Sequence, residues 1–189
     1  MSMKSWEKGS FFTPEFIQDN SWNGYEHDVL CRNDADGKRF TDIGYVTGID
    51  LDTDGRGMTY LDYDLDGDLD VVVVGHRQQA VFLRNDYGQK NNWLQVALVG
   101  TKSNRQSVGA RLALHTGSKT QIREVRAGGG FLQSNSVPQA FGLGQGMQVD
   151  ELTIRWPSGT VQTLKEIPAN QLLHVIEPGE KPLSSLPSE

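Results

Sequence analysis

The chain has few of the sequence features that mark several common protein classes: cysteines, long apolar runs and clusters of basic residues. Its single cysteine, Cys31, excludes an internal disulfide framework and a cysteine-based zinc site. No apolar run is longer than the four residues of Val71–Val74, so the sequence predicts no membrane span. No apolar segment follows the first residues, so no signal peptide is visible. With a net charge of −6 and no cluster of basic residues, the chain is not expected to bind nucleic acid.

Catalytic signatures are also missing from the sequence. The four histidines, His27, His76, His115 and His174, stand too far apart to suggest a metal site. There is no nucleophile-elbow, zinc-protease or phosphate-loop motif. We therefore expect no catalytic residues and no enzymatic activity, although a hydrolase or lyase that uses calcium remains an alternative.

The sequence is rich in glycine, and its acidic and basic residues are distributed unevenly along the chain. Twenty-one glycines and seven prolines in 189 residues indicate many turns, which favours short strands over long helices. Residues 1–90 carry 17 acidic and 9 basic residues, whereas residues 91–176 carry 4 acidic and 8 basic ones. This asymmetry predicts two units with different surfaces.

The first unit contains an internal repeat. Leu30–Asp34 reads Leu-Cys-Arg-Asn-Asp, and Phe82–Asp86 reads Phe-Leu-Arg-Asn-Asp, 52 residues later. Strands are predicted at 58–61, 69–74 and 79–84, and the repeat period fits one four-stranded propeller blade. Little more than one period is present, so this chain alone cannot close a propeller.

The second unit has the pattern of a β-sandwich. Six short stretches read as strands, with clean alternation at Leu152, Ile154 and Trp156. They are 93–99, 108–115, 121–126, 149–156, 160–164 and 171–176. The predicted fold is therefore all-β, with a partial propeller-type repeat unit that carries a calcium loop, followed by a β-sandwich. The expected segments are an irregular lead-in (1–28), the repeat unit (29–90), the sandwich (91–176) and a flexible tail (177–189).

The densest chemical signal is a run of aspartates at 62–70. Asp62, Asp64, Asp66, Asp68 and Asp70 alternate with other residues, and Gly67 stands where a sharp turn is needed. So many like charges in one loop repel each other unless a cation is bound. Calcium takes six to eight oxygen ligands in a flexible geometry. We therefore predict a Ca²⁺ site formed by these residues, with Asp68 contributing its main-chain carbonyl.

Two other calcium-binding patterns match the sequence less well than the run at 62–70. The loop is not an EF-hand, because Val73 stands where the bidentate glutamate of that motif would be and a strand follows instead of a helix. Asp50, Asp52 and Asp54 repeat the start of the pattern, but Met58 occupies the closing position and is a poor calcium ligand. Whether these three hold a second ion stays open at this point.

The motifs together resemble two known families. Residues 29–86 are similar to FG-GAP/VCBS repeats, through the aspartate loop and the repeated Arg-Asn-Asp turns. Residues 91–176 resemble the UnbV/ASPIC domain of the cartilage acidic protein-like family, through stretches that include Gly100–Arg105, Phe141–Gly144 and Arg155–Gly159. The resemblance implies a calcium-binding extracellular protein without established catalysis.

We accordingly expect a non-enzymatic binding or adhesion module that forms part of a larger secreted protein. The alternative is a carbohydrate-binding accessory domain of a larger enzyme. A secreted, periplasmic or cell-surface location is expected, because such a loop is best filled where calcium is millimolar. The partner, whether a protein or a glycan, is not identified by the sequence. The incomplete repeat sheet is expected either to pack against the sandwich or to self-associate with another copy.

Overall fold

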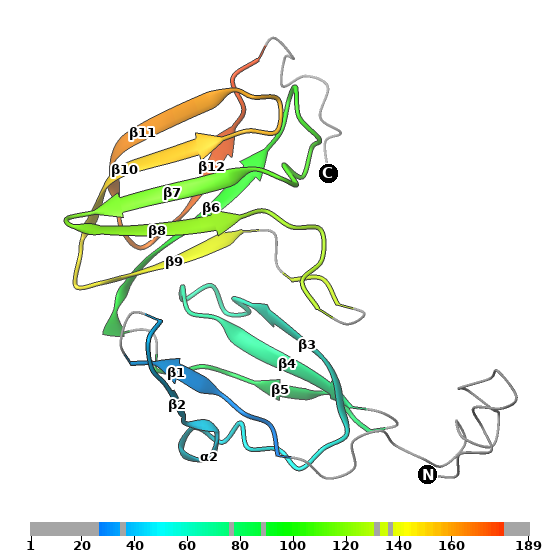
Figure 1. Ribbon diagram of the computed structural model, residues 1–189. Helices are drawn as coiled ribbons and strands as arrows, with labels where there is room; N and C mark the ends of the chain where they lie inside the picture. The colour runs from blue at the N-terminus through cyan, green and yellow to red at the C-terminus, as the bar shows by residue number, and fades with distance from the viewer. Residues whose placement is uncertain are drawn as a thin grey trace, which may run out of the picture. The chain divides into compact units, whose positions relative to one another are not determined.

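The computed structural model describes residues 27–34, 37–75, 78–87, 90–130, 133–135 and 138–179 (Figure 1). The predicted irregular lead-in therefore lies outside the described residues except for positions 27 and 28. The predicted tail lies outside them except for positions 177–179. Within the described residues, the expectation of an all-β chain is confirmed, since α2 (Gly44–Thr47) is a helix of a single turn.

The first half of the chain forms two small sheets. β1 (Cys31–Asn33) pairs antiparallel with β2 (Phe40–Asp42). A three-stranded sheet follows in the order β3-β4-β5. Its strands are β3 (Gly55–Leu61), β4 (Asp70–Gly75) and β5 (Val81–Leu83). The strands predicted at 58–61, 69–74 and 79–84 match these three within a few residues.

The second half forms a four-stranded and a three-stranded sheet. The larger sheet has the order β11-β10-β7-β8 and is antiparallel throughout. Its strands are β7 (Arg111–Thr116), β8 (Lys119–Glu124), β10 (Gln148–Arg155) and β11 (Val161–Pro168). The smaller sheet is β12-β6-β9, in which β6 pairs parallel with β12 and antiparallel with β9. Its strands are β6 (Asn92–Val99), β9 (Gln139–Gly144) and β12 (Gln171–Ile176).

These two sheets enclose one hydrophobic core. Successive side chains of a strand point to opposite faces, so alternate positions are buried. The alternation predicted in β10 is confirmed, because Leu152 and Ile154 are fully buried and Trp156, just after the strand, is 2% exposed. The same cluster receives residues of the smaller sheet, among them Leu94 and Phe141. Two sheets packed around one core form a β-sandwich.

Three strands were not predicted from the sequence. β9 contains Gly142 and Gly144, which weaken the strand pattern, and only Phe141 of this strand is fully buried. β1 and β2 are three residues each and exposed throughout, so no buried face marks them in the sequence.

The chain divides into two compact units that do not follow the order of the sequence. One comprises Met1–Gly57 and Val73–Val81, and the other Met58–Val72 and Phe82–Glu189. The segment that carries the aspartate run at 62–70 therefore belongs to the same compact unit as the sandwich.

Candidate metal centre

The aspartate run folds into the loop between β3 and β4. Gly67 has a φ of +96° and Leu65 a φ of +60°, so the chain reverses through two left-handed residues. Asp62 stabilises this turn with its side chain. Its Oδ1 accepts a hydrogen bond from the Asp66 N–H at 3.1 Å, and its Oδ2 accepts one from the Gly67 N–H at 3.0 Å.

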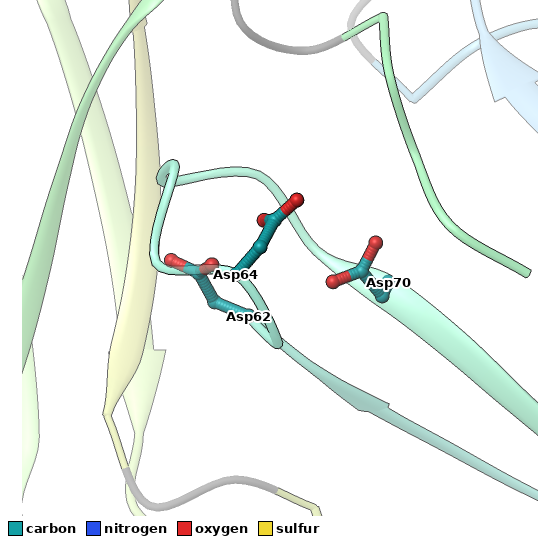
Figure 2. A group of neighbouring side chains, drawn as sticks. All are labelled: Asp62, Asp64 and Asp70. Atoms are coloured by element: carbon teal, nitrogen blue, oxygen red, sulfur yellow. The ribbon is translucent and has the colours of Figure 1, made fainter. Parts of the chain in front are cut away.

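Three of the five predicted ligands come together at this loop. Asp62, Asp64 and Asp70 each offer a carboxylate oxygen, and these oxygens lie within 4.8 Å of one another. Figure 2 shows Asp62 and Asp64 on the loop and Asp70 at the start of β4. Asp70 is 1% exposed, Asp62 is half-buried and Asp64 is exposed. The group is thus anchored at its buried end and open to solvent at Asp64.

Main-chain donors hold the buried carboxylate in place. Asp70 Oδ2 accepts the Tyr63 N–H at 2.9 Å, and Asp70 Oδ1 accepts the Asn85 N–H at 2.9 Å. A carboxylate oxygen has two acceptor sites, so each oxygen can bind a cation while it keeps its hydrogen bond. Asn85 belongs to the second copy of the Arg-Asn-Asp repeat, so the repeat contributes to this centre.

Asp66 and Asp68 lie outside the three-carboxylate group. Asp66 Oδ1 accepts the Asp68 N–H at 3.1 Å, which stabilises the second half of the loop.

A guanidinium group lies close enough to interact with the cluster. Arg84 forms an ion pair with Asp86 at 2.8 Å, and the hydrogen bond to Asp86 is the main cause that raises the pKa of Arg84. Asp64 and Asp70 raise it further through their charges. Arg84 therefore offsets a part of the negative charge of the cluster. Arg32 and Asp34, in the first copy of the repeat, form the same type of pair at 2.6 Å.

The loop also contacts the sandwich strand β6, which sequence reasoning did not foresee. Gln95 Nε2 donates a hydrogen bond to Asp62 Oδ2 at 2.5 Å. The backbone of Gly67 lies against the Trp93 indole, because a β-carbon at position 67 would come within 1.8 Å of ring atom Cε2. The signal in the sequence was the presence of a polar residue, Gln95, inside the otherwise apolar stretch of β6.

A second connection joins β3 to the loop that precedes β9. The Met58 N–H donates to Gln133 Oε1 at 2.6 Å, and the Thr59 hydroxyl donates to the Ser134 carbonyl at 3.0 Å. Both contacts lie inside the compact unit that contains the sandwich. The aspartate loop is therefore supported by strand β6 and, through β3, by residues 133–135.

Two aspartates of the second run have basic side chains as partners. His27 Nδ1 lies 2.9 Å from Asp50, and Arg56 lies 2.5 Å from Asp54. Burial, followed by the charge of Asp50, raises the pKa of Asp28 next to this run. Among the described residues, Asp50, Asp52 and Asp54 do not form a cluster of the kind seen at 62–70.

A different carboxylate, Glu177, accepts five hydrogen bonds, and sequence reasoning missed it. It is 1% exposed, and its Oε2 accepts the N–H groups of Thr101, Lys102 and Ser103 at 2.7–2.9 Å. Its Oε1 accepts the hydroxyls of Ser103 and Ser158. Burial alone would raise the pKa of Glu177, but these hydrogen bonds outweigh it and lower the pKa to about 2. With this pKa, Glu177 is ionised at neutral pH, so its carboxylate accepts these hydrogen bonds and holds residues 101–103 of the loop at 100–107 in place.

Comparison with known proteins supports part of the resemblance. Residues 100–182 match the profile of the family described as ASPIC and UnbV. Cartilage acidic protein 1 of Xenopus tropicalis is 31% identical over 144 residues, which cover 72% of this chain and 22% of the relative. The Mus musculus protein of the same name is 28% identical over 139 residues, covering 69% of this chain and 21% of the relative. The Homo sapiens protein is 29% identical over 133 residues, covering 67% and 20%.

The chain thus spans about a fifth of the length of these relatives. The similarity of residues 29–86 to FG-GAP/VCBS repeats stays a prediction. The similarity of the sandwich half to UnbV/ASPIC domains, predicted from its motifs, is confirmed over residues 100–182.

Proposed function

We propose that the chain is a calcium-binding, non-enzymatic module of a larger secreted or cell-surface protein, in which an FG-GAP/VCBS-like unit is joined to a UnbV/ASPIC-like sandwich. The observation that supports calcium most is the convergence of three carboxylates, from Asp62, Asp64 and Asp70, within 4.8 Å. Their oxygens suit a hard cation such as calcium. The similarity to proteins named cartilage acidic protein 1 supports an extracellular role.

The remaining oxygens would come from the same loop and from solvent. Asp66 and the main-chain carbonyl of Asp68 are our candidates for further ligands, as the spacing predicts. The ion would reduce the repulsion among five aspartates in nine residues and so stabilise the loop. A stabilising ion is consistent with a binding module whose contact surfaces lie in polar loops.

The non-enzymatic role is supported by the state of the acids that could act in catalysis. General acid–base catalysis needs a group whose pKa lies near the working pH. Glu177, although buried, has a pKa of about 2 and is held by donors on both oxygens. Asp62 and Asp70 accept main-chain hydrogen bonds within the loop. These carboxylates therefore serve as fixed acceptors.

The proposal is tested by calorimetric titration of the chain with CaCl₂ after removal of metal by a chelator. We expect half-saturation at about 0.1–1 mM, the range of extracellular calcium modules. Asp64→Asn should weaken calcium binding, because it removes a charge at the open end of the cluster. Asp150→Asn is the matched control, since Asp150 lies in β10 and should leave the titration unchanged. A wild-type chain that takes up no calcium at 10 mM contradicts the proposal.

One observation favours carbohydrate as a second candidate ligand. Tyr63 and Phe82 are 67% and 45% exposed. Their rings pack edge to face, with the ring centroids 5.2 Å apart. Exposed aromatic rings next to a cation site can pack on the apolar face of a sugar. A glycan array would test this, with Tyr63→Ala expected to lose any signal. Tyr45→Ala is the control and should keep it, because Tyr45 is an exposed aromatic residue of α2 and is not part of the aspartate loop.

A further inference from the structure

Gln95 is a buried polar residue in the middle of a core strand. It is 6% exposed and lies in β6 between Leu94 and Val96, which are fully buried. A buried amide is costly unless it is hydrogen-bonded, so its partner indicates why it is placed there. That partner is the Asp62 carboxylate, 33 residues earlier in the chain, at 2.5 Å.

Gln95 shares its face of β6 with Trp93. Residues two apart in a strand point to the same side, and Leu94, Val96 and Leu98 occupy the side that faces the core. Trp93 and Gln95 therefore point to the other side, where they meet Gly67 and Asp62 of the aspartate loop. One face of β6 thus completes the core, and two residues of its other face contact the loop.

The contact from Gln95 acts on the carboxylate that organises the loop. Asp62 Oδ1 accepts the Asp66 N–H, while Asp62 Oδ2 accepts both the Gly67 N–H and the Gln95 amide. With three donors the carboxylate has one orientation, in which an oxygen lies within 4.8 Å of oxygens from Asp64 and Asp70. Loss of the amide would leave Asp62 held only by its own loop.

We infer that Gln95 is a positioning residue for the cation, through which the sandwich sets the calcium affinity of the loop. The inference rests on the proposed calcium site, since Gln95 acts on Asp62 and not on the ion. When a group that hydrogen-bonds to a metal ligand and orients it is lost, the affinity for the metal commonly falls about 10–100-fold. Because coupling between two equilibria is reciprocal, bound calcium would in turn stabilise β6 and the sandwich.

The test is calcium titration of the full chain carrying Gln95→Met, which keeps the length of the side chain and removes the donor. We expect calcium binding to weaken about tenfold or more, while the melting temperature in chelator changes little. The matched control is Gln121→Met, because Gln121 Nε2 also donates a hydrogen bond, to the Gly142 carbonyl, but does so from β8. That control should keep the wild-type affinity.

Gln95→Val provides a second variant, suited to a strand and too short to reach Asp62, in case the methionine variant does not fold. A separate readout is Tb³⁺ luminescence excited through tryptophan, since Trp93 lies against the loop. The Gln95 variants should need about tenfold more Tb³⁺ for half-maximal signal. Wild-type affinity in a folded Gln95 variant would overturn the inference and leave the calcium site standing. Absence of binding in the wild type would instead overturn the proposed function.

Discussion

The backbone of Gly67 rests on the indole ring of Trp93, with the space for a β-carbon already filled: such an atom would lie 1.8 Å from Cε2. Gly67 also has a φ of +96°, which side chains rarely adopt. Position 67 is therefore restricted to glycine for two separate reasons. The first comes from the turn itself and the second from the packing of the turn on β6.

Gly67→Ala should separate these two reasons when it is compared with Gly159→Ala. Gly159 has a φ of +90°, and a β-carbon there would meet nothing within 4 Å. We expect Gly159→Ala to cost about 1 kcal/mol of unfolding free energy, from backbone strain alone. Gly67→Ala should cost about 2–4 kcal/mol, because overpacking is added. Urea unfolding measures both, and equal losses would contradict the packing of Gly67 on Trp93.

Glu177→Gln should destabilise the sandwich. The carboxylate accepts three main-chain N–H groups and two hydroxyls, and a neutral amide cannot accept all five. Hydrogen bonds to a charged group contribute about 1.5–3 kcal/mol, and a loss of that size is expected in urea unfolding at pH 7. Glu124→Gln is the control, since Glu124 is half exposed in a 3.4 Å pair with Arg126 and should cost less than about 0.5 kcal/mol. Equal effects of the two substitutions would argue against a special role for Glu177.

Glu177 should also determine how the free energy of unfolding changes with pH in the acidic range. The pKa of Glu177 is lowered from 4.5 to about 2 in the folded chain. A lowered pKa means that its contribution is complete above pH 4.5 and is lost as the pH falls toward 2. The difference in stability between the wild type and Glu177→Gln should therefore shrink over this interval, as urea titrations at several pH values would show. A difference that stays constant down to pH 2 would be inconsistent with this pKa.

The parts of the fold that follow from local pattern could be predicted from the sequence. Alternation placed Leu152, Ile154 and Trp156 in the core, where they are buried. Spacing placed Asp62, Asp64 and Asp70 in one loop, where their oxygens converge. In both cases the information lies within a few residues of the chain.

What could not be predicted depends on contacts between distant segments. Gln95 meets Asp62 across 33 residues, and Glu177 meets Ser103 across 74. No local period encodes such contacts. Glu177 meets Ser103 because β6 and β12 pair in parallel, which brings the segments after them together. Gln95 meets Asp62 because the loop between β3 and β4 packs on β6. β9 was missed for a different reason, since Gly142 and Gly144 leave too few side chains to mark a strand.

Arg84→Gln should strengthen calcium binding. The Arg84 charge interacts favourably with Asp64 and Asp70, so it opposes a second cation at the same carboxylates. We expect the dissociation constant to fall about two- to fivefold at low ionic strength, and the difference to fade as added salt screens the exposed guanidinium. Arg126→Gln, which removes an exposed arginine paired with Glu124, is the control and should have no effect. Weaker binding in Arg84→Gln would mean that Arg84 supports the site through its pair with Asp86.

The central claim, that a cation holds the aspartate loop of this chain, is tested most directly by thermal unfolding with calcium and with chelator. At a hundredfold excess of calcium over its dissociation constant, a single site adds about 2.7 kcal/mol. For a chain of this size that corresponds to a rise in melting temperature of roughly 5–10 °C. We predict this rise for the wild type and a smaller rise for Asp64→Asn at the same calcium concentration. Superimposable wild-type curves in calcium and in chelator would contradict the claim.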